Sequence, residues 1–288
     1  MSSMEGKDKN RIVYGDNPDV TFFFPDNGGA QLLVEKRKLA QSSVVFQKQF
    51  SEGFESSDRI AIKDISFDTF NVAMKEIYGS SIEIRESNYQ ELLYVASKYF
   101  IYTLIEKIIQ FALTFISAKN LTEHFEAIER YEIKRLNDHI EDICVRHPLE
   151  IIEKLDCTKA HMNLLKIILQ SSNLTCSEYD LYVAVVNMMK EASKDALDVA
   201  TEMRKKLGNL INFIRFPVMS IDELILCAKP PSLLTKEQAL DLLLWVKCGI
   251  YSESVQFFST NSRSIPNFDR CPHCNDRYAY CLSCSKYR

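Results

Sequence analysis

The chain has 288 residues, of which 46% are hydrophobic and 26% are charged, a composition typical of a folded globular protein. Its formal net charge of −4 argues against nucleic-acid binding by the main body and against attraction to an anionic membrane. The low counts of 8 Gly and 8 Pro argue against a turn-rich, all-β architecture, and the length leaves room for two ordinary domains.

The chain shows no sign of secretion or membrane insertion. Its first residues, MSSMEGKDKN, lack the apolar stretch of a signal peptide, and no segment approaches the ~20 apolar residues of a membrane-spanning helix. The nine cysteines are an odd number, and five of them stand singly in helical patterns. In the absence of secretion this indicates reduced thiols, so we expect a cytoplasmic protein, with the nucleus as the alternative location.

Four segments in the first third of the chain have the composition or alternation of β-strands. Residues Val20–Phe24 are β-branched and aromatic, and the turn signal of Asn27 and two glycines separates them from the next apolar run, which predicts a hairpin. A flexible tail is expected at residues 1–15. The predicted strands are residues 20–24, 32–34, 59–65 and 82–84.

Apolar residues at helical spacing alternate with these strands. A stripe of Leu39, Ser43, Phe46 and Phe50 predicts a helical stretch that runs through Phe50. The mixture of strands and helices predicts an α+β domain of about a hundred residues. Three more helices are predicted at residues 67–78, 89–100 and 104–115.

From residue 120 onward the strand pattern disappears and helical spacing continues, so residues 119–250 are predicted to form an all-helical domain. From residue 251 the periodicity is lost and a tail is expected at 251–288. Four N-cap patterns, each with Glu or Gln three residues after the cap, mark predicted helix starts. They are Ser87 with Gln90, Asn120 with Glu123, Ser220 with Glu223 and Thr235 with Gln238.

Motifs spread over both regions resemble a BTB/POZ domain followed by a BACK domain. In the first half they are Asp19-Val20, Lys36, Leu39-Ala40-x-x-Ser43-x-Val45-Phe46, Ile62-x-Asp64-Ile65 and Leu92-Leu93-x-x-Ala96-x-Lys98-Tyr99. In the second half they are Ile214-Arg215-Phe216-Pro217-x-Met219 and Leu233-Leu234-Thr235. The resemblance implies a BTB/POZ domain at 16–118, a BACK domain at 119–250 and a short Cys-rich tail at 251–288. The subgroup that it resembles normally adds a PHR domain, which is expected to be absent here.

The resemblance also implies a function. Proteins of this kind are adaptors for cullin-3 ubiquitin ligases, in which the BTB domain binds the cullin and dimerises while a further domain holds the substrate protein. We therefore expect a dimeric, non-catalytic adaptor that binds cullin-3 and contributes to recruiting an unknown substrate for ubiquitination. The alternative is a cullin-independent scaffold that pairs with full-length paralogues or acts as a nuclear corepressor. No phosphate-binding loop, nucleophile elbow or HExxH motif suggests an enzyme.

Two sets of residues acquire expected roles from this resemblance. Phe50, Ser51 and Glu52 fall where such adaptors carry a hydrophobic-x-Glu motif that contacts cullin-3, with an exposed ring as anchor and a carboxylate as acceptor. The alternative is that Phe50 only ends the helical stripe. Asp19 and Lys36 match an acidic–basic pair of related BTB domains, and a structural ion pair is favoured over a peptide-binding role.

The one constellation with metal chemistry lies in the tail. Cys271, Cys274, Cys281 and Cys284 form two CxxC turns that supply four thiolates, the ligand set of a structural tetrahedral Zn²⁺ site. His273 is an alternate ligand. The other interpretation is a Cys-rich remnant without metal, and no cofactor is expected for the main body.

Overall fold

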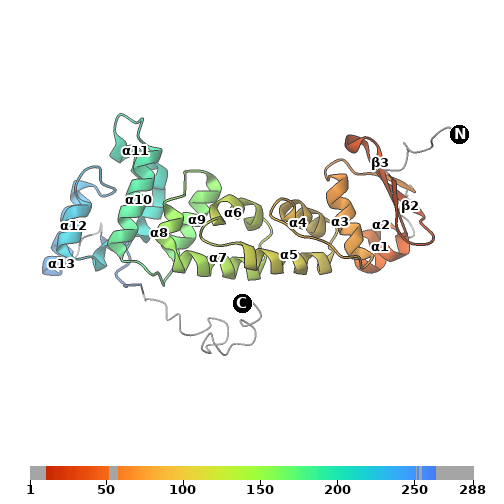
Figure 1. Ribbon diagram of the computed structural model, residues 1–288. Helices are drawn as coiled ribbons and strands as arrows, with labels where there is room; N and C mark the ends of the chain where they lie inside the picture. The colour runs from red at the N-terminus through yellow and green to blue at the C-terminus, as the bar shows by residue number, and fades with distance from the viewer. Residues whose placement is uncertain (1–10, 52–57, 251, 253–254, 264–288) are drawn as a thin grey trace, which may run out of the picture. The chain divides into compact units, whose positions relative to one another are not determined.

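The structure is a computed structural model that describes residues 11–51, 58–250, 252 and 255–263. The chain divides into two compact units, Met1–Phe115 and Ile116–Arg288, named here unit 1 and unit 2. Unit 1 combines a sheet with helices, whereas the described part of unit 2 contains helices and no strand (Figure 1). The predicted α+β class is confirmed.

Unit 1 is built on a mixed sheet whose strand order is β1-β3-β2-β4. The predicted hairpin is present: β2 and β3 are antiparallel, with Phe22 opposite Leu32. Alternate residues of both strands are buried and those between them are half-exposed, the period-two pattern of a sheet with one face on the core. The outer strands pair in parallel, β1 with β3 and β4 with β2. The strands are β1 (Arg11–Val13), β2 (Val20–Phe24), β3 (Ala30–Val34) and β4 (Arg59–Ala61).

An aromatic core joins the sheet of unit 1 to its helices. Phe22 of β2 contacts the rings of Phe46 and Phe70, with centroids 5.8 and 4.8 Å away, and Tyr99 packs against both of these rings. All four side chains are buried. The helices are α1 (Lys36–Ser42), α2 (Val44–Gln49), α3 (Phe67–Ile77), α4 (Tyr89–Lys98) and α5 (Tyr102–Phe115).

The single helical stretch predicted through Phe50 is wrong, because Ser43 divides it into α1 and α2. Ser43 is buried and has an extended backbone, with φ −150° and ψ 123°. Its hydroxyl donates to the carbonyl of Tyr99 and also accepts the backbone N–H of Phe46, which caps the start of α2. A contact made 56 residues away along the chain therefore sets this helix boundary.

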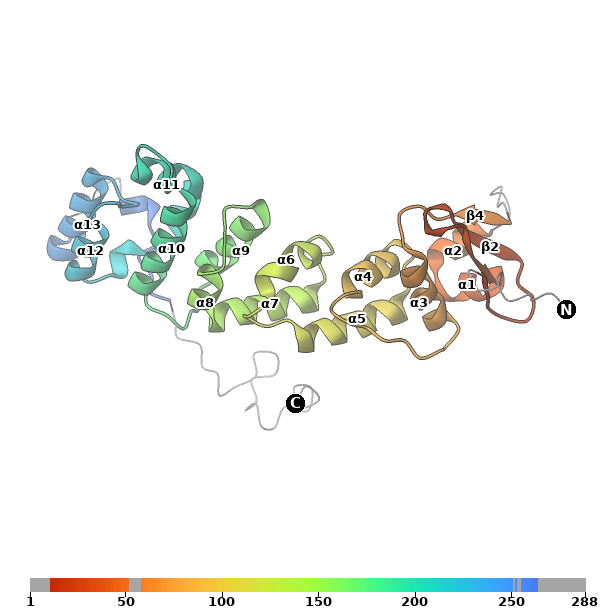
Figure 2. The same cartoon turned by 45° about the horizontal axis from the view of Figure 1, so that its top comes forward.

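Unit 2 is a succession of short helices. Helix α10 contacts α8 on one side and α11 on the other, as both views of the molecule show (Figures 1 and 2). In the described residues no helix is long and apolar enough to span a membrane. The α-helices are α6 (Leu121–Glu129), α7 (Lys134–Arg146), α8 (Pro148–Ile152), α9 (Lys159–Gln170), α10 (Glu178–Ala192), α11 (Val199–Leu207), α12 (Ile221–Cys227) and α13 (Lys236–Cys248). Shorter 3₁₀ turns are η2 (Gly208–Phe213), η3 (Phe216–Val218) and η4 (Val255–Phe257).

The predicted capping boxes have mixed outcomes. Those of Ser220 at α12 and Thr235 at α13 are confirmed, with both reciprocal hydrogen bonds present. The box predicted at Ser87 is wrong, because Asn88 is the N-cap residue of α4 and its side chain accepts a hydrogen bond from the backbone N–H of Arg85 instead. Asn120 does occupy the N-cap of α6, but its side-chain oxygen binds the loop before the helix.

Three other boundaries differ from the prediction. Residues 11–13 belong to the sheet as β1, since their pairing with β3 fixes them, although the flexible tail was expected to run to residue 15. The strand expected at 59–65 keeps only Arg59–Ala61, the residues opposite β2. The strand expected at 82–84 does not form; these residues lie between α3 and α4 without a place in the sheet.

The tail also begins later than the predicted residue 251. Val255 and Phe258 are buried, and the ring of Phe258 meets that of Phe216 edge-on at 5.0 Å. Arg263 donates to the side chain of Glu178 and to the carbonyls of Ser171 and Phe213. Residues 255–263, named here the strap, are thus part of the folded unit 2.

Candidate functional site

The predicted partner motif lies at the C-terminal end of α2. Phe50 is the residue that caps this helix, and its ring stacks on Phe46 with centroids 5.9 Å apart and planes 7° from parallel. Because Phe46 is fully buried and Phe50 is half-buried, Phe50 extends the core out to the surface, and it is less exposed than a freely solvent-facing anchor. Ser51 is exposed and its hydroxyl donates to the carbonyl of Lys48 at 2.8 Å. Glu52 lies outside the described residues.

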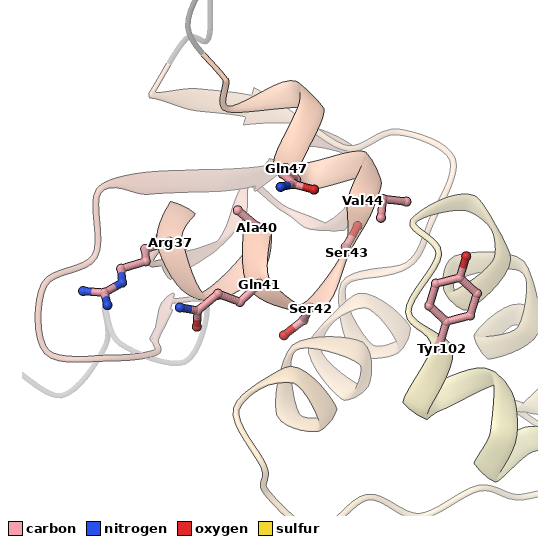
Figure 3. Close-up of a pocket in the computed structure, with 8 residues that line it drawn as sticks. All are labelled: Arg37, Ala40, Gln41, Ser42, Ser43, Val44, Gln47 and Tyr102. Carbon is pink, nitrogen blue, oxygen red and sulfur yellow. The ribbon is translucent and has the colours of Figure 1, made fainter.

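A shallow cavity of about 450 Å³ lies along the same helix (Figure 3). Val44 and Gln47 line it from one face of α2, because they follow the i, i+3 spacing of a helix, whereas Phe50 of the motif caps the end of this helix and stacks on the buried Phe46. Figure 3 shows Val44 on the side of Tyr102, with Arg37 and Gln41 at the opposite, polar end.

Large apolar side chains are exposed beside this cavity. Val44, Phe100 and Tyr102 are 45%, 46% and 60% exposed, and the rings of Phe100 and Tyr102 lie 6.2 Å apart. We name these three residues the α2–α5 surface. Grouped aromatic and apolar side chains in contact with water are typical of a protein-binding surface.

The backbone at Phe100 supports this interpretation. Its φ of +51° places a non-glycine residue in the left-handed region, which costs about 1–2 kcal/mol. This conformation forms the turn between α4 and α5 while half of the ring stays exposed to solvent. Strain held at an exposed aromatic residue is a reason to look for function there.

The sequence interpretation missed the α2–α5 surface. The signal that was available is the run Tyr99-Phe100-Ile101-Tyr102, since four consecutive apolar residues cannot all face one core. Tyr99 and Ile101 are buried, and Phe100 and Tyr102 are exposed.

The prediction that the side chains of Asp19 and Lys36 form an ion pair is wrong, because the partner of the Lys36 side chain is Asp58. The Lys36 ammonium lies 2.6 Å from the carboxylate of Asp58, and these side chains are 23% and 81% exposed. Asp19 instead accepts the backbone N–H of Lys36 at 2.7 Å, one of the N–H groups that the start of α1 leaves without a partner inside the helix. Asp19 therefore stabilises a helix start, and the exposed Lys36–Asp58 pair contributes little to stability.

Four of the described cysteines lie in surroundings that keep their thiols protonated. Burial raises the pKa of the Cys144 and Cys227 thiols to about 12, and that of Cys176 to about 11, so these groups remain protonated at neutral pH. Burial also raises the pKa of Cys157. The four cysteines of the predicted zinc site, Cys271, Cys274, Cys281 and Cys284, lie outside the described residues, so that site stays a prediction.

Comparison with known proteins places the candidate site in a family domain. The family model of the BTB/POZ domain matches residues 14–116, which include α2 and the α2–α5 surface. This region is a BTB/POZ domain. BTB domains generally mediate association with copies of themselves, with paralogues and with other protein partners, and proteins that carry them are generally non-catalytic.

Relatives of known name match beyond the BTB domain. BTB/POZ domain-containing protein 3 of Homo sapiens is 25% identical over 285 residues, which cover 95% of this chain and 54% of the relative. BTB/POZ domain-containing protein 6 of Xenopus tropicalis is 23% identical over 245 residues, which cover 83% of this chain and 46% of the relative. The chain thus spans about half the length of these relatives, and the similarity extends across both units.

Proposed function

We propose that this protein is a non-catalytic adaptor whose BTB domain associates with a second copy or a paralogue and binds cullin-3, and whose unit 2 is a BACK domain. In this role it contributes to substrate recruitment by a cullin-RING ubiquitin ligase. A cytoplasmic location belongs to the same proposal.

The observation that carries the cullin-3 proposal is the α2–α5 surface, because its residue Val44 begins the helix that Phe50 of the hydrophobic-x-Glu motif caps. An exposed Val44, Phe100 and Tyr102 provide apolar area that a partner helix can cover, and the half-buried Phe50 is held in position by its stack on Phe46. A rigid aromatic anchor loses little conformational entropy when a partner binds it. The nearby polar end, with Arg37 and Gln41, supplies hydrogen-bonding groups for the rim of such an interface.

The first test removes the motif. The double substitution Phe50→Ala with Glu52→Ala is expected to abolish co-purification of cullin-3, because both the ring and the carboxylate are lost, while the mass of the dimer stays unchanged. Affinity purification followed by light scattering measures both. Lys63→Ala, which changes an exposed residue after β4, is the control and should retain cullin-3.

Retention of cullin-3 by the double variant would contradict the proposed contact. Co-purification of a BTB-containing paralogue without cullin-3, for the unaltered chain, would favour the cullin-independent scaffold instead.

The second test separates binding from backbone strain at Phe100. Phe100→Ala and Phe100→Gly remove the same ring, but only glycine adopts a positive φ without cost. We expect both variants to bind cullin-3 at least about tenfold more weakly, a loss of ~1.4 kcal/mol, and the glycine variant to be the more stable by about 1 kcal/mol. Isothermal titration and urea denaturation provide the two measurements. If either variant bound cullin-3 with unchanged affinity, Phe100 would not be part of the binding surface.

A further inference from the structure

Helix α10 has apolar residues on two faces, and within unit 2 it packs against both α8 and α11. Leu181, Val185 and Met189 form the buried face. A second stripe, Ala184, Met188 and Ala192, recurs every four residues with Val183 beside it. Met188 is buried, whereas Val183, Ala184 and Ala192 are half-buried. This second stripe lines a groove of about 480 Å³ between α10 and α8, two helices that are in contact (Figures 1 and 2).

We name this groove the α8–α10 groove. The charged residues that line its walls are all acidic. Glu153 and Asp156 lie on the side of α8, and Asp180 and Glu191 lie near the two ends of α10. All four are exposed, and no lysine or arginine is among the residues that line the groove. Two of the four carboxylates already have a basic neighbour: Lys194 lies 2.5 Å from Glu191, and the His161 ring lies 2.7 Å from Asp156. Both acidic side chains stay exposed, and exposed pairs of this kind are weak enough for a partner's lysine or arginine to compete with them.

We propose that the α8–α10 groove binds a helical segment of another protein, with an apolar stripe that is flanked by lysine or arginine. The apolar stripe of such a helix covers the half-buried Ala184 and Ala192, and its basic side chains reach the carboxylates on both walls. Asp180 and Glu191 are eleven residues apart on one helix, about 16 Å at 1.5 Å per residue, which a partner helix of three turns spans. Helix-in-groove binding is a common mode of peptide recognition.

The negative charge of the groove favours a basic helix over nucleic acids, anionic lipids and acidic peptides. The carboxylates repel the phosphates of nucleic acids and of anionic lipids, and an acidic peptide is disfavoured for the same reason. Basic residues at the margin of an apolar helix are attracted, and this attraction steers association as well as adding affinity. The groove lies in unit 2 and its use does not depend on the cullin-3 proposal.

The test uses the full chain and a fluorescein-labelled 15-residue amphipathic helix made of leucine and lysine. Fluorescence anisotropy at 0.15 M salt measures binding, and the same peptide with glutamate in place of lysine should not bind. Glu153→Lys with Glu191→Lys is expected to weaken binding at least tenfold. Both sites lie at the C-terminal ends of their helices, where a lysine is well tolerated. Ala184→Trp, which fills the groove, should weaken binding to the same degree.

The matched control reverses two exposed acidic residues elsewhere in unit 2, Glu126→Lys with Glu141→Lys, and should change the affinity less than threefold. Circular dichroism melting verifies that each variant is folded. An equal loss of affinity in the control, or unchanged binding by Ala184→Trp, would overturn the proposal in favour of diffuse charge attraction.

The last measurement repeats the titration with a chain that ends at Arg263. A tenfold gain in affinity for this chain would show that residues 264–288 already occupy the groove, which also overturns an external partner.

Discussion

Glu178→Ala is expected to lower the free energy of unfolding of unit 2 by about 3–5 kcal/mol, because it leaves a buried guanidinium without its counter-charge. The side chains of Glu178 and Arg263 are only 8% and 4% exposed and form an ion pair. The other oxygen of Glu178 accepts the backbone N–H of Arg215 at 3.1 Å. Burial and the neighbouring Arg263 lower the pKa of Arg215, as expected where two guanidinium groups are served by one carboxylate.

Urea denaturation followed by far-ultraviolet circular dichroism measures this loss. The control is Asp58→Ala, which breaks the exposed pair with Lys36 and should cost less than about 1 kcal/mol. A second variant, Glu178→Met with Arg263→Met, removes both charges and should recover most of the stability, since an apolar pair leaves no unpaired buried charge. Equal losses in Glu178→Ala and Asp58→Ala would show that the strap is not held by its ion pair.

The second large effect is expected in the BTB domain. Phe46→Ala should lower its free energy of unfolding by about 3–5 kcal/mol, the cost of truncating a fully buried phenylalanine. The ring of Phe46 lies between those of Phe22, Phe50 and Tyr99, with centroids 5.8, 5.9 and 4.6 Å away, so the cavity left behind borders three aromatic neighbours.

This variant also tests the link between the core and the candidate site. Without its stacking partner Phe50 loses its fixed position, so cullin-3 binding should weaken even at temperatures where the BTB domain remains folded. Thermal melts and titrations of the same preparation separate the two effects. Val44→Ala is the control for stability, because Val44 is exposed and its truncation should cost no more than about 0.5 kcal/mol. Unaltered stability of Phe46→Ala would contradict the assigned core.

Helix α2 carries core residues on one face and residues of the proposed binding surface on another. Phe46 is buried in the domain, and Val44 and Gln47 line the outer cavity. The partner surface is thus rigid because its supporting residues are core residues, and a binding site that is already ordered loses less free energy when its partner docks.

Several features followed from the sequence by itself, because the interactions that specify them are local. The hairpin of β2 and β3 follows from a β-branched and aromatic run next to a glycine turn, and the starts of α12 and α13 follow from a cap and a Glu or Gln three residues later. The motifs of the BTB domain were equally readable, since each is a short run of neighbouring residues in the sequence. The α+β class needed only the pattern of strands and helices.

Other features were decided only by the tertiary structure, because their partners lie far away along the chain. Ser43 ends α1 since its hydroxyl finds the carbonyl of Tyr99, and Lys36 pairs with Asp58 because β4 returns beside β2. Arg263 reaches Glu178 across 85 residues and fixes a strap that local periodicity does not reveal. The exposure of Phe100 and Tyr102 belongs to the same class. Sequence spacing identifies apolar residues, but only packing determines which of them the core covers and which it leaves for a partner.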